Sequence, residues 1–140
     1  MAKPFHCSVT TPEARILSEE VVSAIVPMHD GQMGFLGDRA PIVGKLGLGE
    51  LRLTFTKGGM RSYLVEKGFA NMVGDKLTIL AERATPAENL NEAEAQAELA
   101  EAQNRVPKDA EDRQRISDDL ARARAKLSVA KSFKSRGGGI

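Results

Sequence analysis

Residues 51–65 read LRLTFTKGGMRSYLV, and this stretch decides the fold of the first part of the chain. Apolar and polar residues alternate from Leu51 to Thr56, which is the period-two pattern of a strand with one buried face. Gly58 and Gly59 follow as a tight turn before an apolar returning segment. Residues 50–65 therefore predict a β hairpin.

The same pattern recurs on both sides of this hairpin. Residues 69–80 predict a second hairpin with its turn at Gly74 and Asp75. Residues 16–17 and 21–26 are apolar or β-branched runs that also suit strands. Many short strands separated by turns are typical of an antiparallel β sandwich or barrel. We therefore expect one β domain over residues 1–86.

The composition changes after Pro86. Residues 91–103 are mostly Ala, Glu, Gln and Leu, which favour a helix, and Asn91 followed by Glu94 suits its N-terminus. Pro107 ends this helix and Asp109 can cap a second one. The short connection predicts an antiparallel helical hairpin over residues 87–136, followed by a flexible tail at residues 137–140. Its second helix carries a stripe of apolar residues spaced by four and three, which should pack the hairpin: Ile116, Leu120, Ala123, Leu127 and Ala130.

Charge is divided unevenly within the hairpin, although the whole chain of 140 residues has a formal net charge of only +1. Residues 87–119 hold ten acids and four bases, whereas residues 120–140 hold no acid. The ordinary interpretation of such a run is a solvated helix face. The absence of acids favours an acidic partner surface, and the lack of aromatic residues other than Phe133 argues against nucleic acid. We call this second helix the basic helix because of its six cations: Arg122, Arg124, Lys126, Lys131, Lys134 and Arg136.

Residue types that support catalysis or metal binding are scarce. Cys7 is the single cysteine, and the two histidines, His6 and His29, lack ligand-like spacing. We therefore expect no disulfide, no metal, no cofactor and no catalytic residues. An enzyme would need a site assembled in three dimensions from residues such as His29, Asp30 and Glu50. No apolar run approaches the roughly 18 residues of a membrane span, so other subunits would have to bring the chain to a membrane.

Five segments of the sequence are similar to sequence motifs of one protein family, and they occur in the same order as in that family. They span nearly the whole chain, from residue 9 to residue 131: Val9–Glu13, Pro27–Leu36, Ala40–Val43 followed by Leu46 and Gly49, Leu77–Ala84, and Leu120–Lys131. The chain thereby resembles the epsilon subunits of F-type ATP synthases.

This resemblance implies a non-catalytic subunit with a sandwich of about ten strands. In that family the sandwich docks on the gamma subunit and the ring of c subunits, so that ion-driven rotation is coupled to ATP synthesis. The helical hairpin either lies compactly or extends toward the catalytic head of alpha and beta subunits, where it blocks ATP hydrolysis. The location implied is the cytoplasmic face of a bacterial plasma membrane, or its organellar equivalent. The resemblance assigns rotor contact to Asp30, Gly31, Gln32, Met33, Gly34, Phe35, Leu36, Arg39, Ala40 and Pro41.

Two departures from the family pattern bear on function. Arg39 stands where the family often has histidine, which removes any role of an imidazole. Some bacterial members bind ATP through a motif that aligns with Leu90–Ala95, but here Glu94 replaces its arginine and would repel a triphosphate. We therefore expect no ATP site. Without the resemblance, the alternative is a β-sandwich interaction module whose hairpin mediates self-association.

Overall fold

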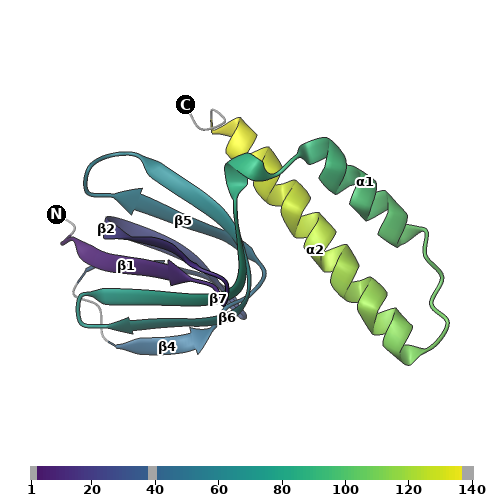
Figure 1. Cartoon of the computed structure of the whole chain (residues 1–140), viewed down its shortest axis with the longest axis horizontal. Helices are drawn as coiled ribbons and strands as arrows, with labels where there is room; N and C mark the ends of the chain where they lie inside the picture. The colour runs from purple at the N-terminus through teal and green to yellow at the C-terminus, as the bar shows by residue number, and fades with distance from the viewer. Residues whose placement is uncertain (1–2, 38–40, 137–140) are drawn as a thin grey trace. The chain divides into compact units, whose positions relative to one another are not determined.

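The computed structural model describes residues 3–37 and 41–136. The chain forms two compact units that divide after Pro86, a β unit followed by a helical unit (Figure 1). The strand and turn patterns up to Pro86, and the change in composition after it, predicted these two kinds of structure in this order. The described residues form seven strands, one short 3-10 turn (η1) and two α-helices: β1 Phe5–Thr10, β2 Arg15–Met28, β3 Gly31–Phe35, β4 Ile42–Lys45, β5 Gly49–Phe55, β6 Met60–Val73, β7 Lys76–Pro86, η1 Ala87–Asn89, α1 Glu92–Gln103 and α2 Ala110–Ser135.

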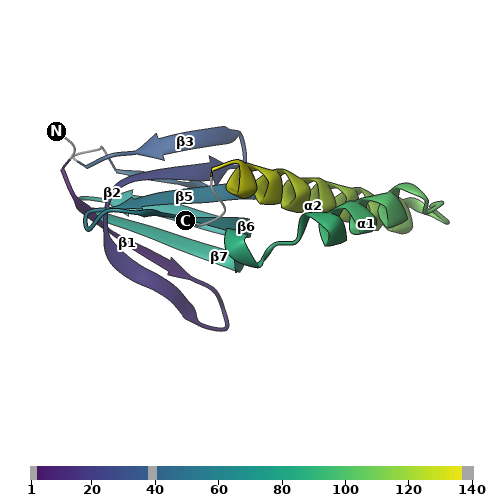
Figure 2. The same cartoon turned by 90° about the horizontal axis from the view of Figure 1, so that it is seen from above.

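Pairing of β1 on both of its edges closes the β unit. β1 runs antiparallel to β2 and parallel to β7, and the order β7-β6-β5-β2 completes a ring of hydrogen-bonded strands. β3 extends from β2 (Figure 2), and β4 pairs with β6 (Figure 1). Because the ring closes on itself, five of its strands have a partner on each side.

The long strands change partners along their length. β2 pairs with β1 up to Val21, its register shifts before Ser23, and its second half pairs with β3 and β5. β6 pairs first with β5 and then with β4, and β7 is shared between β1 and β6. Counting the halves of these long strands separately brings the seven strands to about the ten that the resemblance implies.

The core of the β unit is built from the inward-facing residues of alternating strands. Leu51 and Leu53 are fully buried, as the period-two pattern predicts, and Phe55 packs against the same cluster. Burial of each large apolar side chain is worth about 1.5–3 kcal/mol before ordering costs. Cys7 lies in this core, and desolvation raises the pKa of its thiol to about 12. This thiol is therefore protonated and unreactive near neutral pH.

Both helices of the second unit begin at the predicted caps. The Asn91 side chain accepts a hydrogen bond from the Glu94 N–H at 3.0 Å, and the Asp109 side chain accepts one from the Asp112 N–H at 2.8 Å. Each cap satisfies a helical N–H that has no partner within its own helix.

The predicted apolar stripe on α2 is buried or half-buried along its length. Ile116, Ala123 and Ala130 are buried, and Leu120 and Leu127 are half-buried. Val129 is also buried, which the spacing did not predict. On α1 the buried residues are alanines, Ala95 and Ala102. The first helix therefore contributes little apolar volume to the hairpin.

Gly68 permits a close approach between β6 and β7. Its φ of +128° lies in the region that favours glycine, and a Cβ there would collide with the Leu80 carbonyl oxygen. Gly74 also has positive φ, at +59°, but a Cβ there would meet open space.

We predict that Gly68→Ala lowers the free energy of unfolding by more than about 2 kcal/mol, because backbone strain and a backbone clash add. Gly74→Ala is the control, with an expected loss of about 1–2 kcal/mol from its left-handed backbone alone. Urea denaturation of both variants measures the difference. Equal losses of unfolding free energy in the two variants would show that the close approach at Gly68 adds no cost beyond that of its backbone conformation.

Candidate functional site

The segment from Asp30 to Leu36, to which the resemblance assigns rotor contact, begins in a turn and continues as strand β3. His29 and Asp30 form the turn, and β3 then pairs back along β2 with Val26 opposite Met33 and Ala24 opposite Phe35. The segment is thus held by the register of a β hairpin, which fixes the direction of each side chain.

Strand alternation sorts the predicted contact residues into two groups. Phe35 is only 1% exposed and belongs to the core, and Met33 packs against that core. Phe35 therefore cannot present its side chain to a partner, whereas Met33 is half-buried and presents only part of its side chain. The other described members of the set are exposed, and Leu36 is 54% exposed although it is apolar: Asp30, Gly31, Gln32, Gly34, Leu36 and Pro41. Arg39 and Ala40 lie outside the described residues.

A hollow of about 460 Å³ lies beside the exposed side of this hairpin. The residues that line it come from the paired parts of β2 and β3 and from the segment after β3: Ser23, Ala24, Ile25, Gly34, Phe35, Leu36 and Gly37. Its lining is mainly apolar, and it contains no charged side chain. A hollow of this character suits an apolar side chain of a protein partner.

An exposed apolar surface on β4, β6 and β7 was not predicted. Phe69 is 51% exposed and pairs directly with Leu80, which is also 51% exposed. Val43 at 70% and Val73 at 57% exposure share this outward face, because Val43 pairs with Asn71, two residues from each of Phe69 and Val73. We call Val43, Phe69, Val73 and Leu80 the outer-sheet patch. Apolar residues grouped on an exposed sheet face are typical of a protein interface.

The sequence does carry a signal for this patch. Four of the five residues from Phe69 to Val73 are apolar, so that both faces of this part of the strand are apolar. Such a strand needs cover on its two sides. The core covers Ala70 and Met72, and the residues on the other side are the exposed ones.

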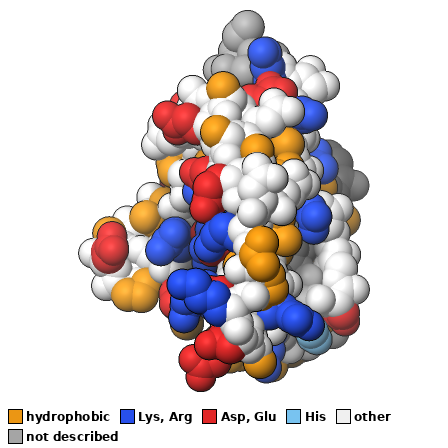
Figure 3. Space-filling view, turned by 90° about the vertical axis from the view of Figure 1, so that its right-hand side faces the viewer, with side chains coloured by type: hydrophobic (Ala, Val, Ile, Leu, Met, Phe, Trp, Pro, Cys, Tyr) orange, Lys and Arg blue, Asp and Glu red, His pale blue; other side chains and the backbone are white. Residues whose placement is uncertain are grey.

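Three of the six cations in the basic helix are engaged within the hairpin. Arg122 contacts Asp119 at 3.3 Å, and Lys126 contacts Glu98 of α1 at 3.1 Å. The Arg136 guanidinium donates a hydrogen bond to the Ser132 hydroxyl. The remaining three, Arg124, Lys131 and Lys134, are exposed. Cationic and anionic side chains are correspondingly interspersed on the face of the molecule in Figure 3.

Arg105, just after α1, links the two helices. Its Nη2 donates to Asp119 Oδ2 at 2.8 Å, and this hydrogen bond is the main cause that raises the pKa of Arg105 above its usual value. Its Nε lies 3.2 Å from Glu101 Oε1, which is an ion-pair contact without hydrogen-bond geometry. Asp119 therefore holds both Arg105 and Arg122.

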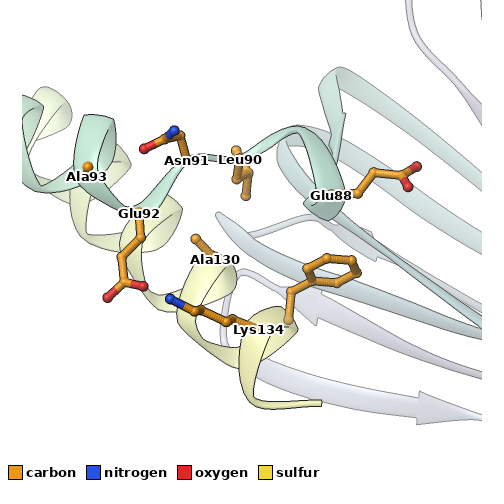
Figure 4. A pocket seen from close by; sticks show the side chains of 8 residues that line it. Glu88, Leu90, Asn91, Glu92, Ala93, Ala130 and Lys134 are labelled. Carbon is orange, nitrogen blue, oxygen red and sulfur yellow. The ribbon is translucent and has the colours of Figure 1, made fainter. Parts of the chain in front are cut away.

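A pocket of about 390 Å³ lies within the helical unit. It forms where the segment that aligns with the family's ATP motif, residues 90–95, meets the end of α2. Figure 4 shows Glu92 and Lys134 reaching toward one another from α1 and α2, and Glu88 pointing away from them. Two carboxylates and one ammonium give this lining a negative balance, which disfavours a polyphosphate. The full lining is Glu88, Leu90, Asn91, Glu92, Ala93, Ala130, Phe133 and Lys134.

The residues considered for catalysis take ordinary structural positions. His29 and Asp30 are exposed in the β2–β3 turn, and Glu50 on β5 forms an ion pair of 3.7 Å with Arg52. Among the described residues, no three His, Cys, Asp or Glu side chains gather as a metal site would require. Within the same part of the chain, no helix is long and apolar enough to cross a membrane.

Comparison with known proteins gives one consistent family. Residues 4–87 match the family described as ATP synthase, Delta/Epsilon chain, beta-sandwich domain. An ATP synthase epsilon chain of Rhodopirellula baltica is 38% identical over 127 residues, which are 90% of this chain and 98% of that protein. One from Rhizobium rhizogenes is 32% identical over 74% of this chain and 82% of its own length.

Solved structures share the fold. A chain of the Euglena gracilis mitochondrial ATP synthase, in a structure of OSCP, F1 and the c-ring, has a TM-score of 0.72 at 20% identity, covering 93% of this chain and 79% of that one. A chain from the Tetrahymena thermophila mitochondrial ATP synthase, in a structure of the central stalk and c-ring, has a TM-score of 0.66 at 14% identity and covers 89% and 95%. On the family match and the sequence identity of its relatives, this chain belongs to the epsilon subunits of ATP synthase.

Proposed function

We propose that this chain is a non-catalytic subunit of the central stalk of an F-type ATP synthase. Its β unit couples rotation of the c ring to the catalytic head, and its helical hairpin restrains ATP hydrolysis. The proposal rests on the β unit. Its residues 4–87 match the delta/epsilon family, and one of its sheet faces is apolar and exposed. A subunit that works only inside an assembly needs such a face.

Two surfaces of the β unit suit two stalk partners. The exposed residues of the β2–β3 hairpin, with the apolar hollow beside them, form the proposed contact with the c ring. The outer-sheet patch is a broader apolar surface, and it suits the gamma subunit. Phe69 is its best anchor, because aromatic side chains contribute strongly to interface energy and this one is already half in solvent.

The helical unit has properties that suit a movable regulator. Its first helix buries alanines, so that apolar packing holds the hairpin only modestly. Arg124, Lys131 and Lys134 are exposed and can meet carboxylates on the alpha and beta subunits of the head. An element with two arrangements a few kcal/mol apart responds to a partner of similar differential affinity.

The remaining assignments follow from this proposal. The chain reaches the membrane through the other subunits, at the cytoplasmic face of a bacterial plasma membrane or its organellar equivalent. It uses no cofactor and binds no nucleic acid. A self-associating interaction module remains the alternative, and copurification separates the two, since stoichiometric capture of a gamma subunit supports a stalk subunit and a stable homodimer supports the alternative.

We predict that truncation after Ala87 raises ATP hydrolysis by the reconstituted complex several-fold, because the restraining hairpin is removed. A full-length variant with Arg124, Lys131 and Lys134 changed to Gln should show part of the same increase. Steady-state hydrolysis measures both. The truncated chain must still bind the gamma subunit in the same assay. Unchanged hydrolysis with retained binding would remove the inhibitory role.

We predict that Phe69→Asp weakens binding to the gamma subunit by at least about tenfold, since it places a charge in the centre of an apolar contact. Met60→Asp is the matched control, because Met60 is a similarly exposed apolar residue at the β5–β6 turn, outside the outer-sheet patch. Surface plasmon resonance with immobilised gamma subunit compares the two. Equal affinities would place the gamma contact elsewhere.

We predict no ATP binding in the micromolar range, because Glu88 and Glu92 line the hairpin pocket with only Lys134 to oppose them. Isothermal titration of the full-length chain with magnesium-ATP checks this. The variant Glu92→Gln serves as a comparison, in which any weak affinity should increase. A micromolar dissociation constant for the unaltered chain would contradict the prediction.

A further inference from the structure

We propose that the glycine-rich segment that joins β4 to β5, residues 44–49, positions the β2–β3 turn for its contact with the c ring, and that this positioning depends on Gly47. The inference rests on the proposed role of the β2–β3 hairpin as the c-ring contact. It adds to that site a group of positioning residues, which act through the backbone of the turn formed by His29 and Asp30.

The segment holds the base of the turn by two backbone hydrogen bonds. The His29 N–H donates to the Lys45 carbonyl oxygen at 3.0 Å, and the Gly47 N–H donates to the Pro27 carbonyl oxygen at 2.7 Å. One bond thus lies at the first residue of the turn, and the other lies near the end of β2. Two bonds at neighbouring levels of a strand fix its register, and register fixes the direction of the side chains that follow.

The segment is in turn attached to the closed ring of strands. Leu46 forms an isolated antiparallel bridge with Met28, and the Leu46 N–H donates to the Gly68 carbonyl oxygen of β6 at 2.9 Å. Leu46 and Met28 are both buried in the core of the β unit. Support therefore runs from a ring strand through Leu46 to the backbone that enters the turn. A two-stranded hairpin without such support has little rigidity of its own.

Gly47 leaves no space for a side chain. A Cβ at this position would lie 2.6 Å from the Met28 carbonyl oxygen, 3.0 Å from the Met28 carbonyl carbon and 3.3 Å from the His29 Cα. All three are backbone atoms, which cannot rotate away as the end of a side chain can. An alanine at position 47 therefore has to displace the backbone of Met28 and His29, from which the turn begins.

The two neighbouring glycines approach the same strand less closely or meet softer groups. A Cβ at Gly44 would lie 2.7 Å from Met28 Cε, which is the end of a flexible side chain. A Cβ at Gly49 would lie 3.0 Å from the Cβ of Pro27. The same change to alanine is thus graded by what the new methyl group meets. At Gly44 it meets a side-chain tip, at Gly49 a proline ring, and at Gly47 the backbone.

The first measurement follows the turn in the full-length chain without any partner. We expect Gly47→Ala to raise the exchange rate of the His29 amide hydrogen by at least about tenfold, because its bond to the Lys45 carbonyl opens more often. Gly44→Ala is the matched control and should keep this rate within about twofold. Hydrogen exchange followed by nuclear magnetic resonance resolves this single amide.

The second measurement is binding to detergent-solubilised c ring. The gamma subunit is compared alone and in complex with the full-length chain, and the chain should increase its affinity for the ring. We expect Gly47→Ala to remove at least about fivefold of this affinity, Gly49→Ala less, and Gly44→Ala none, because a contact that is no longer held in place binds more weakly. Val9→Ala removes buried methyl groups from β1, which does not pair with the segment, and should keep the affinity. It separates positioning from stability.

Two outcomes would overturn the inference. One is faster exchange of the His29 amide in Gly47→Ala with unchanged affinity for the c ring, and the other is an equal loss of affinity in Gly44→Ala and Gly47→Ala. If Gly47→Ala does not fold, the comparison of Gly49→Ala with Gly44→Ala carries the same test. Failure of the proposed function has a different signature. The unaltered chain would then add no affinity for the c ring to the gamma subunit, and the inference would fall with it.

Discussion

The β unit depends on the position of β1 between β2 and β7. This one strand, with Cys7 and Val9 fully buried, supplies an antiparallel pairing on one edge and a parallel pairing on the other. Without it, β2 and β7 would each expose an unpaired row of backbone groups. Closure also holds β2 in a fixed register, and β2 in turn holds β3. The proposed contact with the c ring is therefore built on a rigid support, although its exposed residues lie at the periphery.

A closed ring has further consequences for where partners can bind. Strand addition is blocked wherever a ring strand is paired on both edges, so that contacts there have to use side chains on sheet faces and turns. The outer-sheet patch provides such a face. The helical unit follows a different principle, because its apolar contacts are small and its charged contacts are numerous.

Sequence patterns predicted the local structure well where one physical signal dominated. The hairpin around Gly58 and Gly59, the caps at Asn91 and Asp109, and the buried stripe on α2 all follow from turn chemistry, side-chain hydrogen bonds or periodicity. Sequence patterns did not predict that the segment after Asp30 is a strand. Phe35 faces the core and Leu36 faces solvent because of the way β3 pairs with β2. This pairing is a contact between two strands, and no pattern in the local sequence reveals it.

The charge pattern was similarly incomplete as a guide. Six bases without an acid in residues 120–140 predicted an available basic surface, yet Glu98 lies 28 positions from Lys126 and only the folded hairpin brings them together. The outer-sheet patch was missed because alternation was used to find the buried face of each strand. The opposite face of β6 is also apolar at Phe69 and Val73, and this composition is the sequence signal for the patch.

The alanine surface of α1 has a consequence for alignment of the two helices. Ala95 and Ala102 offer neither knobs nor deep holes, so that apolar packing alone would tolerate a slip of α2 by one turn. The pairs Lys126–Glu98 and Arg105–Asp119 lie at two separate levels of the hairpin, and a slipped arrangement would break both at once. Charge therefore favours one pairing of the turns of the two helices over an arrangement that is slipped by one turn.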